Sequence, residues 1–248
     1  MSGATGATGV DGGIASPAFP VLGALSRLAA AVSDPFATFD REGWSLGNLS
    51  PAEVEALAAE PAFRHPLRRA VSEKVASGLS GLPSDEFIRI AAAPEGRLAI
   101  SMLAAPVADV LDLALLSAGA AVHRDVLTTT GKAERAALRA RLGSEAYLLA
   151  TQEASGLYPA LAALGDSRQF HAAIAADENA GRRQFATLGL GLLFALINPV
   201  APPLPDLIAR RLPPDYRTGG ALSAKPAEIG RLLRLIDRRR PSWLATIG

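Results

Sequence analysis

The sequence contains no cysteine, and that absence removes several classes of site at once. Disulfide scaffolds, iron–sulfur clusters, cysteine-bound zinc and thiol nucleophiles all need a residue that this 248-residue chain lacks. Histidine is nearly as scarce: only His65, His123 and His171 are present. A metal site built on several histidines would therefore use almost all of them.

An excess of charge of one sign is also missing. The 25 basic residues face 24 acidic ones, so the net charge is +1, which argues against a general binder of polyanions. The longest apolar stretches are residues 98–122, which contain two aspartates and a proline, and residues 186–197, which are shorter than the roughly 20 residues that a membrane span needs. The chain also starts without the basic and apolar regions of a secretory signal. We therefore expect a cytoplasmic protein without membrane insertion.

Aromatic residues make up only 5% of the chain, and valine, isoleucine and threonine are few, so most of the usual material of β-strands is missing. Alanine and leucine are abundant instead, with 50 and 36 residues, and both are strong helix formers. The composition predicts an all-α fold. We expect a single multi-helix globular domain over residues 17–248, preceded by a flexible, disordered tail at residues 1–16 that is rich in glycine, alanine, serine and threonine.

Apolar residues at helical spacing and helix-start residues place the individual helices. Ser50 and Glu53 form the pattern of a capping box, and Ser144 is expected to cap another helix. In the helix at 132–142, Arg135, Arg139 and Arg141 are expected to point outward, with Gly143 just after its end. A Pro/Gly-rich irregular segment is expected at 199–226. The predicted helices are 19–32, 51–60, from Pro66 to about 78, 87–93, 107–122, 132–142, 145–154, 167–179, 182–197, 206–212 and 226–240.

A search for catalytic motifs finds little. The Gly-x-Ser-x-Gly pattern occurs once, at residues 43–47, and no complete phosphate-binding loop is present. The Gly189-x-Gly191 pair lacks a third glycine, so Gly189 is more typical of close helix packing. His171, Asp177 and Glu178 form the only cluster that suggests a metal or acid–base site. His171 and Glu178 are seven residues apart, on one face of the predicted helix, but two such ligands leave a metal mostly uncoordinated. His123 is expected to be a hydrogen-bonded, partly buried residue. We expect no enzyme activity and no metal or cofactor.

Arginine clusters raise a further alternative, which is nucleic-acid binding. They occur at residues 68–69, 182–183, 210–211 and 238–240, without interleaved aromatic residues that would stack on bases and with acidic residues nearby. A solvated or protein-facing surface is favoured, and no nucleic-acid partner is expected. On the last helix, Arg231, Arg234 and Arg238 are the best candidates for contact with an acidic partner protein, although an ordinary solvated face explains them equally well.

Two stretches carry a family resemblance. The first is residues 113–123 (LALLSAGAAVH), followed by residues 142–150 (LGSEAYLLA). The second runs from Arg183 through the Gly-Leu-rich helix to the Arg-Leu-Pro sequence at 211–213. In this order they resemble the K subunit of bacterial type III secretion systems, the SctK/YscK family. The resemblance covers about residues 100–213, and its motifs are helical patterns rather than a catalytic signature.

The resemblance implies a non-enzymatic adaptor of the cytoplasmic sorting platform. Such a subunit links the cytoplasmic domain of the membrane-ring D subunit to the Q-subunit pods, and it lies peripherally at the inner-membrane secretion complex. The alternative that the residues leave open is a helical enzyme or small-ligand-binding protein with a site near His123 or His171. In either case Leu115 and Leu193 are expected in the core.

Overall fold

The computed structural model describes residues 26, 29, 33, 34, 36, 46–77, 84–216 and 226–244. Regular structure in these residues is helical, apart from one isolated bridge between Leu46 and Leu49, so the predicted all-α fold is confirmed. The helices are α3 (Pro51–Ala59), α4 (Pro61–Ser77), α5 (Ser84–Ala92), α6 (Pro94–Ala104), α7 (Val107–Ala121), α8 (His123–Thr128), α9 (Lys132–Leu142), α10 (Ser144–Leu148), α11 (Ala154–Leu157), α12 (Ser167–Ala175), α13 (Glu178–Ile197), α14 (Pro203–Arg211) and α15 (Pro226–Arg239). Short turns join them: the π-helical η2 (Leu149–Glu153) and the 3₁₀ turns η3 (Pro159–Leu164), η4 (Pro214–Tyr216) and η5 (Pro241–Trp243).

The predicted tail at 1–16 lies outside the described residues, as does most of the predicted helix at 19–32 and the 217–225 part of the Pro/Gly-rich segment. The rest of that segment is more helical than expected. Helix α14 begins at Pro203, three residues before the predicted start, because a proline fits the first turn of a helix, where its missing N–H has no partner to lose.

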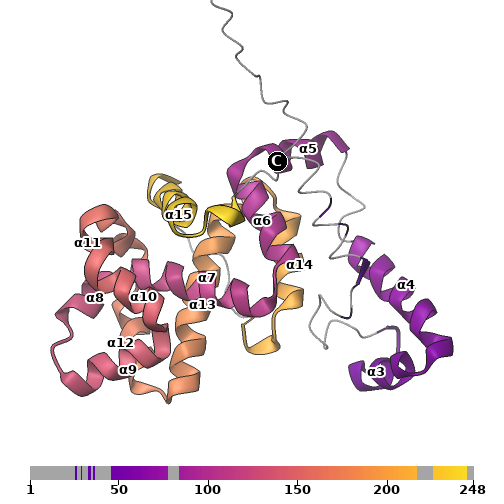
Figure 1. Cartoon of the computed structure of the whole chain (residues 1–248), viewed down its shortest axis with the longest axis horizontal. Helices are drawn as coiled ribbons and strands as arrows, with labels where there is room; N and C mark the ends of the chain where they lie inside the picture. Colours follow the sequence, from indigo (N-terminus) through magenta and orange to yellow (C-terminus); the bar gives the residue numbers. More distant parts are fainter. Residues whose placement is uncertain are drawn as a thin grey trace, which may run out of the picture.

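Helices α3 and α4 pack against each other and lie apart from the other helices in Figure 1. The predicted capping box is present: the Ser50 hydroxyl accepts from the Glu53 amide at 3.3 Å, and the Glu53 carboxylate accepts from the Ser50 amide at 2.8 Å. The predicted start of the next helix is wrong. Helix α4 begins at Pro61 and runs through Pro66, whose ring removes only one hydrogen bond near the helix start.

At the centre of the molecule, α7 and α13 cross at close range. A Cβ atom on Gly189 would lie 1.8 Å from the carbonyl oxygen of Ala114, far closer than atoms can approach. The absence of a side chain therefore allows the two backbones to meet. The predicted role of Gly189 in close helix packing is confirmed.

Two hydrophobic clusters flank this helix pair. The larger one adds side chains from α5, α6, η3, α14 and α15, and the smaller one adds side chains from α8, α9, α10 and α12. Figure 1 shows the same division, with α8–α12 on one side of α13, α6 and α14 on the other, and α15 above. Leu115 and Leu193 are 2% and 0% exposed, so both are core residues as predicted.

The boundary between α12 and α13 differs from the prediction. The expected helix at 167–179 ends at Ala175, and α13 begins at Glu178 rather than at Arg182. Asp177 causes the break, because its carboxylate accepts from the amide of Ala180 at 2.8 Å and so caps a new helix.

The expected helix at 145–154 also changes form. Gly143 is its N-cap residue, with a φ of 82°, and no side chain caps the helix, so the prediction that Ser144 would cap it is wrong. The chain widens into the π turn η2 before it continues as α11. Within that turn the Thr151 hydroxyl donates to the carbonyl of Tyr147 at 2.9 Å, and such bonds compete with the regular backbone ladder.

Two arginines are buried structural residues. Arg141, which was expected outward with Arg135 and Arg139, is only 9% exposed and donates to the carbonyl of Ala176 at 2.6 Å. Gly181 leaves room for it, since a Cβ there would lie 2.6 Å from the arginine side chain. The free carbonyls at the end of α12 attract the guanidinium into the interior.

Arg211, at the end of α14, is 3% exposed and donates to carbonyls of the last turn of α6, including that of Ala105 at 2.5 Å. Burial lowers the pKa of Arg211 to about 10, so the guanidinium still carries its charge at neutral pH. It fastens α14 to α6. Over the described ranges, no helix combines the length and the apolar run that a membrane crossing requires.

Candidate docking site on the last helix

The last helix, α15, has two unlike faces. Leu232, Leu235 and Ile236 are fully buried against the larger cluster, and Ile229 is 8% exposed. The helix begins at Pro226 and ends before Pro241, which opens the 3₁₀ turn η5. The apolar residues recur every three or four positions, so one stripe of the helix faces the core and the opposite side carries charge.

Three arginines lie along one edge of the polar face. Arg231 is half-buried, and Arg234 and Arg238 are exposed. At 100° per residue these positions fall within about 60° of the helix circumference, and they span about 10 Å along its axis. Among the described residues, no carboxylate is within salt-bridge distance of their guanidinium groups. We call these three residues the arginine stripe.

The two arginines that follow the stripe behave differently. Arg239 forms an ion pair with Glu153, which lies in the π turn η2, and Arg240 forms one with Glu145 in α10. Arg239 is the last residue of α15 and Arg240 follows it, so the two pairs connect the end of this helix to η2 and α10. The three arginines of the stripe form no ion pair with a described residue.

The arginine stripe borders an open hollow of about 350 Å³, which we call the α15 hollow. Its other lining residues are Leu157, at the end of α11, and Tyr158, which follows that helix. Leu157 is 47% exposed, whereas Tyr158 is 9% exposed and packs with the core. The hollow thus combines an exposed leucine with three permanent positive charges, because an arginine keeps its proton at physiological pH.

The sequence singled out the three arginines but not their neighbours. Leu157 and Tyr158 lie more than seventy positions earlier in the chain, in a stretch of ordinary helical composition. Only the packing of α15 beside η3 brings them to the stripe. The other exposed leucines and isoleucine, Leu127, Leu148 and Ile88, do not line this hollow.

A second hollow, of about 170 Å³, lies at the start of α10. Its charged residues are already paired: Arg182 contacts Asp112 at 3.4 Å, and Glu145 contacts Arg240. Paired charges offer less to a ligand than free ones, because the existing pair must be broken first. The α15 hollow is therefore the stronger candidate.

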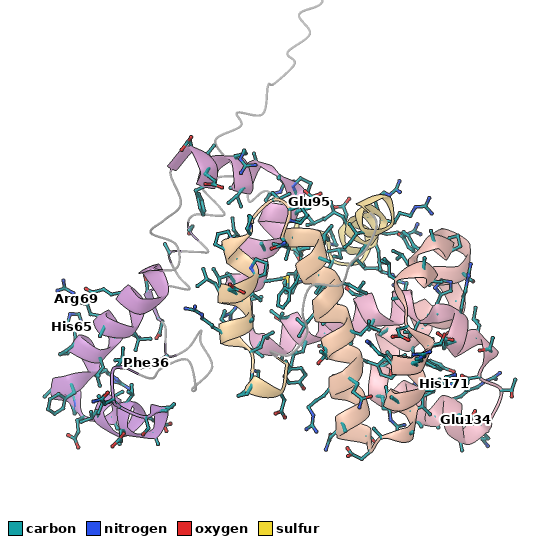
Figure 2. The ribbon with its side chains drawn as sticks, turned by 180° about the vertical axis from the view of Figure 1, so that it is seen from behind. Phe36, His65, Arg69, Glu95, Glu134 and His171 are labelled. Atoms are coloured by element: carbon teal, nitrogen blue, oxygen red, sulfur yellow. The ribbon has the colours of Figure 1, made fainter. Side chains whose placement is uncertain are left out.

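The histidines do not form a site in the described part of the chain. His123 is 1% exposed, and its Nδ1 lies 2.8 Å from the carbonyl oxygen of Ala120, so it is the buried, hydrogen-bonded residue that was predicted. His171 is exposed on α12 and contacts the ring of Phe170 edge-on, and neither His123 nor His171 lines the two hollows. Figure 2 shows His65 and His171 at opposite ends of the molecule.

The expectation that His171 and Glu178 share one helix face is wrong, because they belong to α12 and α13 respectively. Asp177, the third member of that proposed group, is engaged as the N-cap of α13. Across the described ranges, no group of three or more histidine and acidic side chains is placed to hold a metal ion.

The arginine clusters that suggested nucleic-acid binding are largely engaged within the molecule. Arg211 is buried, and six other members form ion pairs with acidic side chains. The pairs are Arg68 with Asp34 at 2.8 Å, Arg69 with Glu73 at 2.9 Å, Arg182 with Asp112 at 3.4 Å, Arg183 with Asp215 at 3.6 Å, Arg239 with Glu153 and Arg240 with Glu145. In the described part of the chain these ion pairs place negative charge beside the clusters, which reduces the local positive field that attracts a phosphate backbone.

Comparison with known proteins gives no relative: no family model matches the chain, and no curated protein or solved structure is significantly similar to it.

Proposed function

We propose that this protein is a non-enzymatic adaptor of the cytoplasmic sorting platform of a bacterial type III secretion system. In this role it links the cytoplasmic domain of the membrane-ring D subunit to the Q-subunit pods, and it lies peripherally at the inner-membrane complex. The proposal starts from the resemblance of residues 100–213 to the K-subunit family. The catalytically sparse sequence agrees with it.

The contacts between the resembling stretches are the observation that carries the proposal. Gly119, in the first stretch, lies where a Cβ would be 2.7 Å from the carbonyl of Ala146, in the following LGSEAYLLA segment. Gly189, in the second stretch, meets Ala114 of the first. The glycines that mark the resemblance in the sequence are thus contact points between its parts.

The surface supports a docking role more than a catalytic one. The α15 hollow presents an exposed leucine and an arginine stripe, which suits an acidic protein partner. The alternative is an enzyme or small-ligand binder that uses His123 or His171. The described residues support it less, because His123 is hydrogen-bonded to a backbone carbonyl and His171 is exposed with no cluster of described acidic side chains around it.

The test is to co-express the chain with the Q- and D-subunit homologues from the same genome and to measure complex formation by size-exclusion chromatography with light scattering. We expect a complex with both, and a deletion strain that no longer secretes and regains secretion with the wild-type gene. We also expect genes for an export ATPase and ring proteins beside the gene. The proposal is contradicted if the protein elutes separately from both partners and the deletion strain still secretes normally.

A matched variant separates the adaptor from the alternative. His171→Ala alters an exposed side chain and leaves the core untouched, so the adaptor role predicts normal complexes and normal secretion. A site that depends on His171 predicts loss of function with the fold intact.

A further inference from the structure

We propose that the α15 hollow binds an acidic amphipathic helix of a partner protein, with carboxylates on the arginine stripe and one apolar side chain on Leu157. The inference rests on the docking role proposed above, and it names the chemistry of the partner. It does not depend on which subunit carries the helix.

The positive charge of the stripe is complementary to carboxylates on a partner protein. Arg231, Arg234 and Arg238 have no acidic partner among the described residues, whereas the neighbouring Arg239 and Arg240 are both paired. A guanidinium binds a carboxylate through two parallel hydrogen bonds, so each free arginine provides a directional site as well as a charge. A partner with acidic side chains completes the pairing that α15 leaves open.

The spacing of the stripe favours a helix over an extended chain. Successive arginines are three and four residues apart, which places them about 4.5 and 6 Å apart along the axis. A helix lying alongside α15 presents carboxylates at the same intervals when they occupy positions i, i+3 and i+7. Alternate residues of an extended chain are about 6.6 Å apart and drift out of register over the length of the stripe.

Leu157 supplies the apolar part of the contact. Its side chain is 47% exposed beside the guanidinium groups, and Tyr158 forms the adjoining buried wall. At about 350 Å³ the hollow is near the lower limit of ligand pockets, which suits one or two side chains of a docked segment better than a whole small molecule. An apolar residue between the carboxylates of the partner helix would cover Leu157 and exclude water from the ion pairs.

An anionic membrane or a nucleic acid fits this surface less well. Glu145, Glu153 and the exposed Asp237 lie on or beside α15, so the surroundings of the stripe carry both signs of charge. A flat polyanionic surface would meet these carboxylates together with the arginines, and the resulting repulsion offsets part of the attraction. A narrow helix contacts the stripe alone.

The experiment measures binding of fluorescein-labelled peptides to the full-length protein by fluorescence anisotropy. The probe is a helix-forming alanine-rich peptide with glutamates at positions i, i+3 and i+7 and a leucine on the same face. One control peptide has glutamine in place of glutamate, and a second has the same composition with the glutamates at alternate positions. Vesicles of phosphatidylcholine with phosphatidylserine, assayed by co-sedimentation, test the membrane alternative.

Two triple variants of equal charge separate the stripe from net charge. Arg231→Gln, Arg234→Gln and Arg238→Gln together remove the stripe. The control removes three exposed arginines elsewhere, Arg124→Gln, Arg168→Gln and Arg210→Gln. Unchanged melting curves by circular dichroism establish that both variants fold.

We expect the probe to bind wild-type protein and the control variant equally, and the stripe variant about tenfold or more weakly. Leu157→Ala should weaken binding about fivefold, and added salt should weaken it further because it screens the ion pairs. The inference is overturned if the probe does not bind, if either control peptide binds equally well, if the two triple variants are equivalent, or if only the vesicles bind. If the stripe variant binds the Q or D subunit with wild-type affinity, the α15 hollow is not the docking site. That result would not contradict the adaptor role.

Discussion

Replacement of Gly189 by alanine tests whether the crossing of α7 and α13 organises the fold. The added Cβ would lie 1.8 Å from the carbonyl oxygen of Ala114, and real Cβ atoms essentially never approach closer than 3.0 Å. The two helices must therefore separate by more than 1 Å. Both clashing groups are part of, or attached directly to, the backbone, so no rotamer change relieves the contact.

Two opposing effects set the magnitude. Alanine favours a helix over glycine by about 1 kcal/mol. Overpacking of a close contact costs about 1–3 kcal/mol and occasionally more, and a gap of 0.5–1 Å already removes about a quarter to a half of the dispersion energy between packed atoms. Because α7 and α13 contribute to both hydrophobic clusters, we expect a cost at the upper end of this range. After the gain in helix propensity is subtracted, Gly189→Ala should lower the free energy of unfolding by about 2 kcal/mol.

Gly230→Ala is the matched control, since a Cβ at Gly230 in α15 meets no atom within 4 Å. The same substitution there should raise the free energy of unfolding by about 0.5–1 kcal/mol. Urea denaturation followed by far-ultraviolet circular dichroism measures both variants. The reasoning is refuted if Gly189→Ala is as stable as wild type or if the two variants change stability in the same direction.

Four further predictions concern stability. Leu193→Ala should cost about 2–5 kcal/mol in urea denaturation, because the residue is fully buried, whereas the exposed Leu157→Ala should change stability by less than about 0.5 kcal/mol. Asp177→Ala should cost about 1 kcal/mol through loss of the α13 cap, and the asparagine variant should retain most of the stability. Arg211→Met should cost about 1–3 kcal/mol by leaving buried carbonyls of α6 without a donor, and lysine should fail to restore the loss. The hydrogen bonds from the backbone and side chain of Ser50 hold the pKa of the Glu53 carboxyl below its usual 4.5, so the stabilisation of α3 by Glu53 is present above pH 4.5 and is lost as the pH falls through the folded-state pKa. Nuclear magnetic resonance of the α3 amides should show this pH-dependent loss, and Glu53→Gln should remove the pH dependence.

The candidate docking site has some features that the sequence predicts and others that it does not. The three arginines of the stripe are separated by three and four residues on an amphipathic segment, so their common face follows from the helical period. Their freedom from ion pairs does not follow, because Arg239 and Arg240 have the same residue type and lie directly beside them. Glu145 and Glu153 decide which arginines are engaged, and these carboxylates belong to α10 and η2, which are far from α15 in the sequence.

The fold shows the same limit at Arg141 and Asp177. A helical wheel of residues 132–142 places Arg141 among outward arginines, but the end of α12 and the space above Gly181 make a buried position favourable. The sequence predicts Asp177 inside a helix at 167–179, but in the structure its carboxylate caps α13. In both places a local pattern allows two structures, and a contact with another segment or a hydrogen bond selects one.

The all-α class, the capping box at Ser50, the glycine after α9 and the core positions of Leu115 and Leu193 were readable in the sequence, because each depends on composition or on neighbours a few residues away. The burial of Arg141, the pairing of Arg239 and Arg240, and the contact of Leu157 with the arginine stripe were decided only by the tertiary structure. Each of these requires groups from distant segments to come within a few ångströms, and helical periodicity carries no information about which distant segments meet.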